Sequence, residues 1–152
     1  MDRKRLVPLA AVVVLAAAII GLKVLSDNHQ ATVTVSEEIR AALSSGTPVL
    51  FVFTYQGDCC ESTRKFFEGY GQAVTKGVED FGSSRLAVVW LDTSLADEGS
   101  EKAILGLAAQ YDITLVPSVA LVDGSGRLLV SRSGLLEPDG LRALLLASLG
   151  GG

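Results

Sequence analysis

Residues 48–67 read PVLFVFTYQGDCCESTRKFF, and this stretch decides the fold class. Its first part, residues 48–55, is a continuous apolar run with β-branched and aromatic side chains, which is typical of a strand buried on both faces in a parallel sheet. The run passes through Gln56 and Gly57 to two adjacent cysteines, after which a helical pattern begins. The stretch therefore predicts a buried strand that leads directly into a cysteine-bearing helix.

The segments next to this stretch favour further helices and a short strand. Before it, residues 32–35 favour a brief strand, and Ser36 can cap a helix that runs to Leu43 and ends at Gly46. After it comes an apolar stripe at helical spacing, made of Phe66, Tyr70, Val74, Val78 and Phe81. Three glycines within this second helix predict that it is kinked or interrupted.

The rest of the chain continues the alternation of strands and helices. The expected elements are a strand at 85–92, a helix at 101–111, strands at 118–122 and 127–131, and a last helix from Pro138 to 149. Residues 123–126 read DGSG, a strong signal for a hairpin between two strands. The order β-α-β-α-β-α-β-β-α predicts one α/β domain over residues 32–149, with a mixed central sheet and helices on both faces.

A long apolar segment precedes this domain. Residues 6–25 carry a single charge, Lys23, and about 20 such residues suffice for a helix that crosses a membrane. The tip at residues 1–5 is basic, and residues 26–31 form a polar linker, so the positive-inside rule places the domain outside the cytoplasm. A cleaved signal peptide is the alternative, but its apolar region is usually about 7–15 residues and ends in small residues. We therefore expect an uncleaved membrane anchor.

The predicted domain is acidic. The whole chain has 13 basic and 17 acidic residues. Four of the basic residues and one acid lie before residue 26, which leaves 9 basic and 16 acidic residues and a formal charge of −7. Nucleic acids and anionic lipid surfaces attract basic proteins, so neither is an expected partner.

Two stretches resemble the thioredoxin superfamily. One is residues 48–67, and the other is residues 111–134, YDITLVPSVALVDGSGRLLVSRSG, which is similar to the family's Tyr-x-Ile-x-x-(Ile/Val)-Pro-(Thr/Ser) segment, hairpin and following glycine. The resemblance covers roughly residues 31–149 and implies a three-layer thioredoxin-like fold. It also implies a cis Val116–Pro117 bond that faces the cysteine helix. In such a fold Pro117 shapes a substrate groove, where the backbone of Val116 and Ser118 binds an extended polypeptide.

The cysteine motif departs from the family pattern. The family carries Cys-x-x-Cys, whereas residues 57–63 read GDCCEST and no Cys-x-x-Cys occurs in the chain. Asp58 and Glu61 have the spacing of a capping box at the start of a helix. This arrangement would make Cys59 the first helical residue and Cys60 the second, where free amides and the helix dipole stabilise a thiolate.

Three chemistries fit an adjacent cysteine pair. Cys59 could attack a disulfide, with Ser62 in the resolving position and Cys60 or a partner supplying the second thiol. The pair could instead cycle as a vicinal disulfide, although adjacent Cα atoms about 3.8 Å apart make that ring strained. A soft metal such as Cu(I) is the third candidate, but neighbouring helical thiols diverge and rarely meet on one ion.

These observations favour a membrane-tethered protein that exchanges thiols and disulfides with protein substrates through Cys59. Cys60 and Pro117 would complete the site, a membrane redox protein is a candidate partner, and no cofactor is expected. The alternative is a redox-silent domain that binds a polypeptide. Tyr55 and Gln56 could line a substrate groove or be ordinary loop residues, and Trp90 is expected in the core or packed on the sheet.

Overall fold

The computed structural model describes residues 34–57, 60–94 and 97–150. The basic tip, the expected membrane anchor at 6–25 and the linker lie outside these residues, so their prediction stays untested. Among the helices that the structure describes, none is both long enough and apolar enough to cross a membrane.

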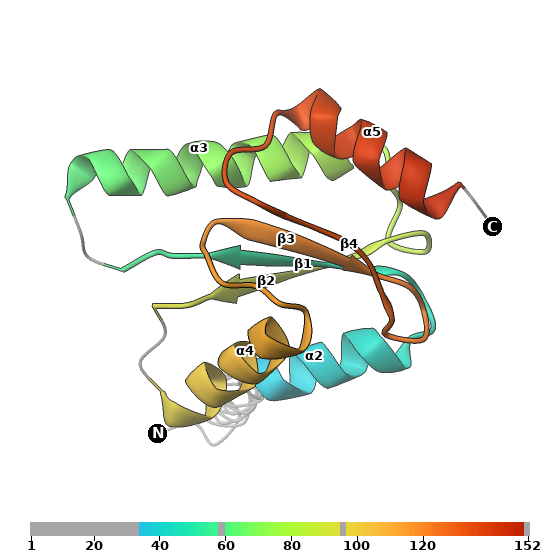
Figure 1. The fold of residues 1–152 in the computed structure, drawn as a ribbon, viewed down its shortest axis with the longest axis horizontal. Helices are drawn as coiled ribbons and strands as arrows, with labels where there is room; N and C mark the ends of the chain where they lie inside the picture. Colours follow the sequence, from blue (N-terminus) through green and yellow to red (C-terminus); the bar gives the residue numbers. More distant parts are fainter. Residues whose placement is uncertain (1–33, 58–59, 95–96, 151–152) are drawn as a thin grey trace, which may run out of the picture. The chain divides into compact units, whose positions relative to one another are not determined.

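The described residues form a four-stranded mixed sheet with two helices on each face (Figure 1). In chain order the elements are α2 (Val35–Ser44), β1 (Val49–Thr54), α3 (Glu61–Val78), β2 (Ala87–Asp92), α4 (Glu98–Gln110), β3 (Ser118–Val122), β4 (Leu128–Ser133) and α5 (Pro138–Leu149). The strand order is β2-β1-β3-β4, with β1 parallel to β2 and antiparallel to β3. The predicted α/β class and three-layer architecture are confirmed.

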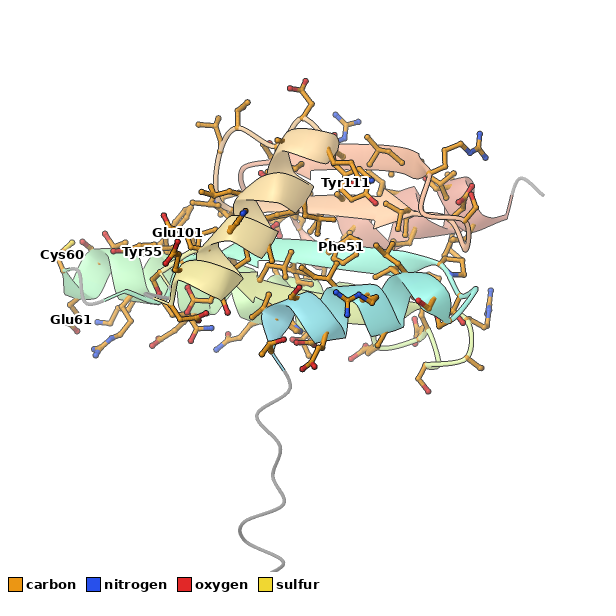
Figure 2. The ribbon with its side chains drawn as sticks, turned by 90° about the horizontal axis from the view of Figure 1, so that it is seen from below. Phe51, Tyr55, Cys60, Glu61, Glu101 and Tyr111 are labelled. Atoms are coloured by element: carbon orange, nitrogen blue, oxygen red, sulfur yellow. The ribbon has the colours of Figure 1, made fainter. Side chains whose placement is uncertain are left out.

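Strand β1 is the centre of the core, as its apolar run predicts. Every residue of β1 is buried, and alternate side chains enter opposite layers because successive residues of a strand point to opposite faces. Phe51 and Phe53 pack into the layer covered by α2 and α4, while Leu50 and Val52 pack into the layer covered by α3 and α5. The ring of Phe51 stacks on Tyr111 with centroids 6.0 Å apart (Figure 2).

Helix α2 begins earlier than the sequence indicates. Thr34 is its N-cap, and Val35, expected in a strand, is the first helical residue. The amide of Glu37 donates to the Thr34 hydroxyl at 3.3 Å, and the Thr34 amide donates to the Glu37 carboxylate at 3.0 Å. This reciprocal capping box satisfies two helix-end donors, which is why Thr34 rather than Ser36 caps the helix. Gly46, at φ +72°, ends the segment as predicted.

Helix α3 is continuous over Glu61–Val78, so the predicted interruption is wrong. Tyr70 and Val74 are buried as expected, whereas Phe66 is 41% exposed. A Cβ atom at Gly77 would lie 2.9 Å from the Leu141 side chain, so glycine here lets α5 pack closely against α3. Packing of this kind, rather than helix propensity, provides most helical stability in proteins, and it offsets the cost of the glycines.

The β3–β4 hairpin forms at residues 123–126 as predicted. The Asp123 carboxylate accepts hydrogen bonds from Ser125 and Arg127, and these bonds hold the pKa of Asp123 below its usual range. The Tyr111 hydroxyl donates to the Gly126 carbonyl at 3.0 Å, and burial together with the nearby Asp123 carboxylate raises the pKa of this phenol. The hairpin is therefore tied to the segment that enters β3.

Candidate functional site

The strand register brings the two candidate segments to one edge of the sheet. Phe53 of β1 pairs with Ser118 of β3, so the end of β1 and the start of β3 lie side by side. The chain leaves β1 toward Cys60, and Pro117 immediately precedes β3. The Val116–Pro117 bond is cis, which confirms that prediction.

Cys60 is the N-cap of α3. Its backbone is extended, with φ −68° and ψ 155°, and its carbonyl accepts from the amides of Thr63 at 3.0 Å and Arg64 at 3.2 Å. The helix therefore begins at Glu61, and the predicted capping box of Asp58 and Glu61, with Cys60 as second helical residue, is wrong. The register differs because the Cys60 carbonyl accepts the hydrogen bonds of the first helical turn.

The Cys60 side chain is exposed and lies between two hydroxyl groups. Its Sγ atom is 3.0 Å from Ser62 Oγ and 3.1 Å from Thr63 Oγ1. Figure 2 shows Cys60 at the tip of the molecule, where α3 begins. Each hydroxyl can donate to a thiolate, and the amides of a helix start carry partial positive charge, so the position favours a negatively charged sulfur.

The nearby charged side chains form pairs along α3. Lys65 Nζ is 2.7 Å from Glu61 Oε1, and Arg64 Nε is 3.7 Å from Glu68 Oε1. All four side chains are well exposed, so these pairs contribute little to stability. Each cation therefore has a carboxylate beside it, which offsets part of its effect on a nearby thiolate.

Asp92, at the end of β2, holds the segment that leads from β1 toward the cysteines. Its Oδ1 atom accepts hydrogen bonds from the Gln56 amide at 3.1 Å and from the Ser94 amide at 2.9 Å. The Ser94 hydroxyl donates to the same oxygen at 2.7 Å. Asp92 thus positions the loop, consistent with its expected place at a strand end.

A cavity of about 310 Å³ adjoins the cysteine helix. Its lining residues are Thr54, Tyr55, Gln56, Gly57, Thr63, Arg64, Phe67, Glu68, Gly71 and Trp90. Trp90 is 38% exposed, so it does not lie in the core, the first of its two predicted places, but packs on the sheet near α3, which is the second. It lies on β2, an edge strand of the sheet that the described residues form, and its neighbour across the cavity is the small Gly71. Tyr55 and Gln56 line a cavity, which favours the first of their two predicted roles.

Sequence reasoning found part of this site. Cys60 and Ser62 lie together, whereas Cys59 and Asp58 lie outside the described residues and the attacking role of Cys59 stays a prediction. Thr63 was missed, although it follows the N-cap by the three residues that bring side chains together on a helix. No cluster of three metal-ligating side chains occurs within the described ranges. That search leaves the copper hypothesis untested, because the hypothesis also needs Cys59.

Solved structures with the same arrangement define the class of fold. A DsbH oxidoreductase superposes with a TM-score of 0.58 at 16% identity, over 78% of this chain and 83% of that one. A mutant thioredoxin from Halobacterium salinarum NRC-1 gives 0.50 at 20% identity, over 74% and 83%. The thioredoxin domain of a thiol-disulfide oxidoreductase from Bacteroides vulgatus gives 0.50 at 17% identity, over 70% and 81%.

The chain therefore has a thioredoxin-like fold, as the resemblance implied. Comparison of the sequence with protein-family models gives no match. Comparison with curated proteins also gives none. At these levels of identity the superpositions establish the fold alone, so the activity has to be argued from the site.

Proposed function

We propose that this protein carries out thiol–disulfide exchange with protein substrates through its adjacent cysteines, with Cys60 as the attacking thiol. The observation that carries the proposal is the exposed Cys60 Sγ at the start of α3, within 3.1 Å of two hydroxyl groups. A thiolate is the reactive form of cysteine, and helix starts favour it. Cys59, which the sequence alone favours for this role, is the second thiol.

The exchange takes two steps. The Cys60 thiolate attacks one sulfur of a substrate disulfide, forms a mixed disulfide and expels the other substrate sulfur as a thiolate. A second thiol, from Cys59 or from a membrane redox partner, then attacks Cys60 Sγ and releases the first substrate sulfur. The substrate gains two electrons, and the two thiols end as a disulfide with each other.

The edge beside Pro117 suits an extended polypeptide substrate. The Pro117 carbonyl accepts from the Gly134 amide at 2.8 Å, which continues the β3–β4 pairing beyond the start of β3 and the end of β4. Three apolar side chains flank this pair and are exposed: Leu115 by 66%, Val116 by 40% and Leu135 by 71%. Exposed apolar side chains that lie together often mark an interaction surface. We therefore assign polypeptide binding to this edge, with the Val116 backbone as the partner. Ser118, which the sequence also predicts for this role, is fully buried and pairs with Phe53 and Ser133 inside the sheet.

Trapping the intermediate tests the proposal. The reduced full-length protein in detergent is mixed with glutathione disulfide, and the intact mass is recorded over time. We expect a transient mass increase of one glutathionyl group, followed by its loss as the second thiol reacts. The matched control is the Cys59→Ser/Cys60→Ser double variant, which should show no adduct. A wild-type protein that neither gains an adduct nor becomes oxidised at its two cysteines would contradict the proposal, and the same experiment with a peptide disulfide would then exclude exchange if it too left the thiols reduced.

We also propose that residues 6–25 hold the domain to a membrane, with the domain outside the cytoplasm. The proposal rests on the length and purity of the apolar run and on the basic residues before it. An alkaline carbonate wash should leave the full-length chain in the membrane pellet and release a variant that begins at residue 26. A mature chain that starts near residue 25, found by N-terminal sequencing, would instead establish a cleaved signal peptide.

A redox-silent polypeptide-binding domain is the second candidate function. It is favoured by the same apolar edge at Leu115, Val116 and Leu135, which needs no thiol. The two candidates differ in whether the thiols react. A redox-silent domain would bind polypeptides but form no mixed disulfide with them, whereas an exchange protein would do both.

A further inference from the structure

We infer that the cavity beside Cys60 is a specificity subsite for an aromatic side chain that adjoins the reacting cysteine of a polypeptide substrate. The inference rests on the proposed function and names the class of substrate. Three observations support it: the cavity adjoins Cys60 Sγ, its walls are aromatic, and the rest of the protein holds those walls in place.

Thr63 links the cavity to the reactive sulfur. Its side chain lines the cavity, and its Oγ1 atom is 3.1 Å from Cys60 Sγ. Only the Thr63 side chain therefore separates the cavity from Cys60 Sγ, the atom that would form the mixed disulfide. The Cα atoms of consecutive residues are about 3.8 Å apart, so the residue next to the substrate cysteine lies within side-chain reach of this space where the bound chain turns out of a regular strand.

The walls suit an aromatic ring. Tyr55 and Phe67 present tilted rings with centroids 5.8 Å apart, and Trp90 forms part of the wall. Aromatic rings pack best edge-to-face or offset at about this separation. A volume of about 310 Å³ holds one large side chain and is at the lower end for small-molecule sites.

The aromatic wall is held in place by the protein itself. A Cβ atom at Gly57 would overlap the Tyr55 ring, so that ring lies directly against the backbone of the loop, and the Phe67 ring lies 5.8 Å from it, centroid to centroid. The neighbouring Gln56 amide is held by Asp92. Because these side chains are already ordered, less conformational entropy is lost when a ligand binds.

The polar residues in the lining favour a peptide over a small anionic thiol. Gln56 can hydrogen-bond to a peptide backbone, whereas Arg64 already has Glu68 beside it at 3.7 Å. A tripeptide thiol such as glutathione carries carboxylates, which bind best to a cation that has no other carboxylate beside it. It also has no aromatic ring that could pack against the cavity walls. We therefore assign the cavity to an aromatic residue of a polypeptide.

The test compares two peptides that differ only beside the cysteine. Acetyl-Phe-Cys-Phe-amide and acetyl-Ala-Cys-Ala-amide are each prepared as a mixed disulfide with thionitrobenzoate, whose release on attack by the protein thiolate is followed by absorbance. The full-length reduced protein in detergent should react about tenfold faster with the phenylalanine peptide, because burying one aromatic side chain contributes enough free energy for that ratio.

Two glycines of α3 provide a matched pair of variants. A Cβ atom at Gly71 would point to the Trp90 ring, 3.9 Å away, so Gly71→Leu fills the cavity, whereas a Cβ atom at Gly69 meets nothing within 4 Å. Both changes replace a helical glycine and should favour the helix, so a loss of function does not reflect unfolding. We expect Gly71→Leu to bring the phenylalanine-to-alanine rate ratio near one and Gly69→Leu to keep it near ten.

A second readout needs no thiol chemistry. Trp90 is the single tryptophan of the chain, so its fluorescence reports on the cavity. In the Cys59→Ser/Cys60→Ser variant, the reduced phenylalanine peptide should shift Trp90 emission, and the alanine peptide should not. Equal rates for the two peptides and no fluorescence shift would overturn the subsite while leaving exchange intact. A shift without reaction of either peptide would support the subsite and exclude the exchange activity.

Discussion

Replacing Cys60 with serine should lower the rate constant for reaction with a chromogenic disulfide at pH 7 by about tenfold. An ordinary cysteine is only a few per cent thiolate at pH 7, so full ionisation alone would raise its rate of attack about thirtyfold. The gain is smaller in practice, because a thiolate of lower basicity is a weaker nucleophile. Cys60 has the helix start and the hydroxyls of Ser62 and Thr63 to favour the thiolate. The measurement is stopped-flow absorbance on the reduced full-length protein.

The matched variant is Cys59→Ser, which should keep the fast reaction because Cys60 is intact. The opposite pattern, with the fast phase lost in Cys59→Ser and kept in Cys60→Ser, would give the attacking role to Cys59, as the sequence alone suggests. If neither cysteine reacts faster in the folded protein than in denaturant, thiol–disulfide exchange is excluded and the polypeptide-binding alternative stands.

Replacing Phe51 with alanine should lower the free energy of unfolding by about 3–5 kcal/mol. Phe51 is fully buried at the middle of β1 and stacks on Tyr111, so truncation loses apolar contacts and leaves a cavity between the sheet and its helices. Domains of this size are stable by about 5–15 kcal/mol, so the change removes a large fraction of that stability. Urea unfolding followed by circular dichroism measures it.

Leu105→Ala is the control for this prediction. Leu105 lies on α4 and is 59% exposed, so its truncation should change the free energy of unfolding by no more than about 0.5 kcal/mol. A Phe51→Ala protein that unfolds at the wild-type urea concentration would contradict the placement of β1 at the centre of the core.

The elements with strong local signals were predicted correctly. The apolar run of β1, the hairpin at 123–126 and the proline that opens α5 all carry their signal within a few residues, and all three are confirmed. Helix starts were predicted less well. Thr34 and Cys60 cap their helices in place of Ser36 and Asp58, because several neighbouring residues could each accept the first hydrogen bonds.

The site was only half visible in the sequence. The adjacent cysteines and the Val116–Pro117 pair stand out as residue types, and their spacing resembles a known family. The contact of Thr63 with Cys60 depends on where α3 begins, which a shift of one or two residues changes. The position of Trp90 depends on β2 being an edge strand of the described sheet with a glycine across from it.

By itself, the sequence determined the α/β class, the buried strand that leads to the cysteines, and the acidic character of the domain, because composition and periodicity are local properties. Only the tertiary structure decided which cysteine caps α3, which hydroxyls surround its sulfur, and that three aromatic side chains from β2, α3 and the loop after β1 line one cavity beside it. These features depend on strand order and helix register, which arise when distant segments pack together.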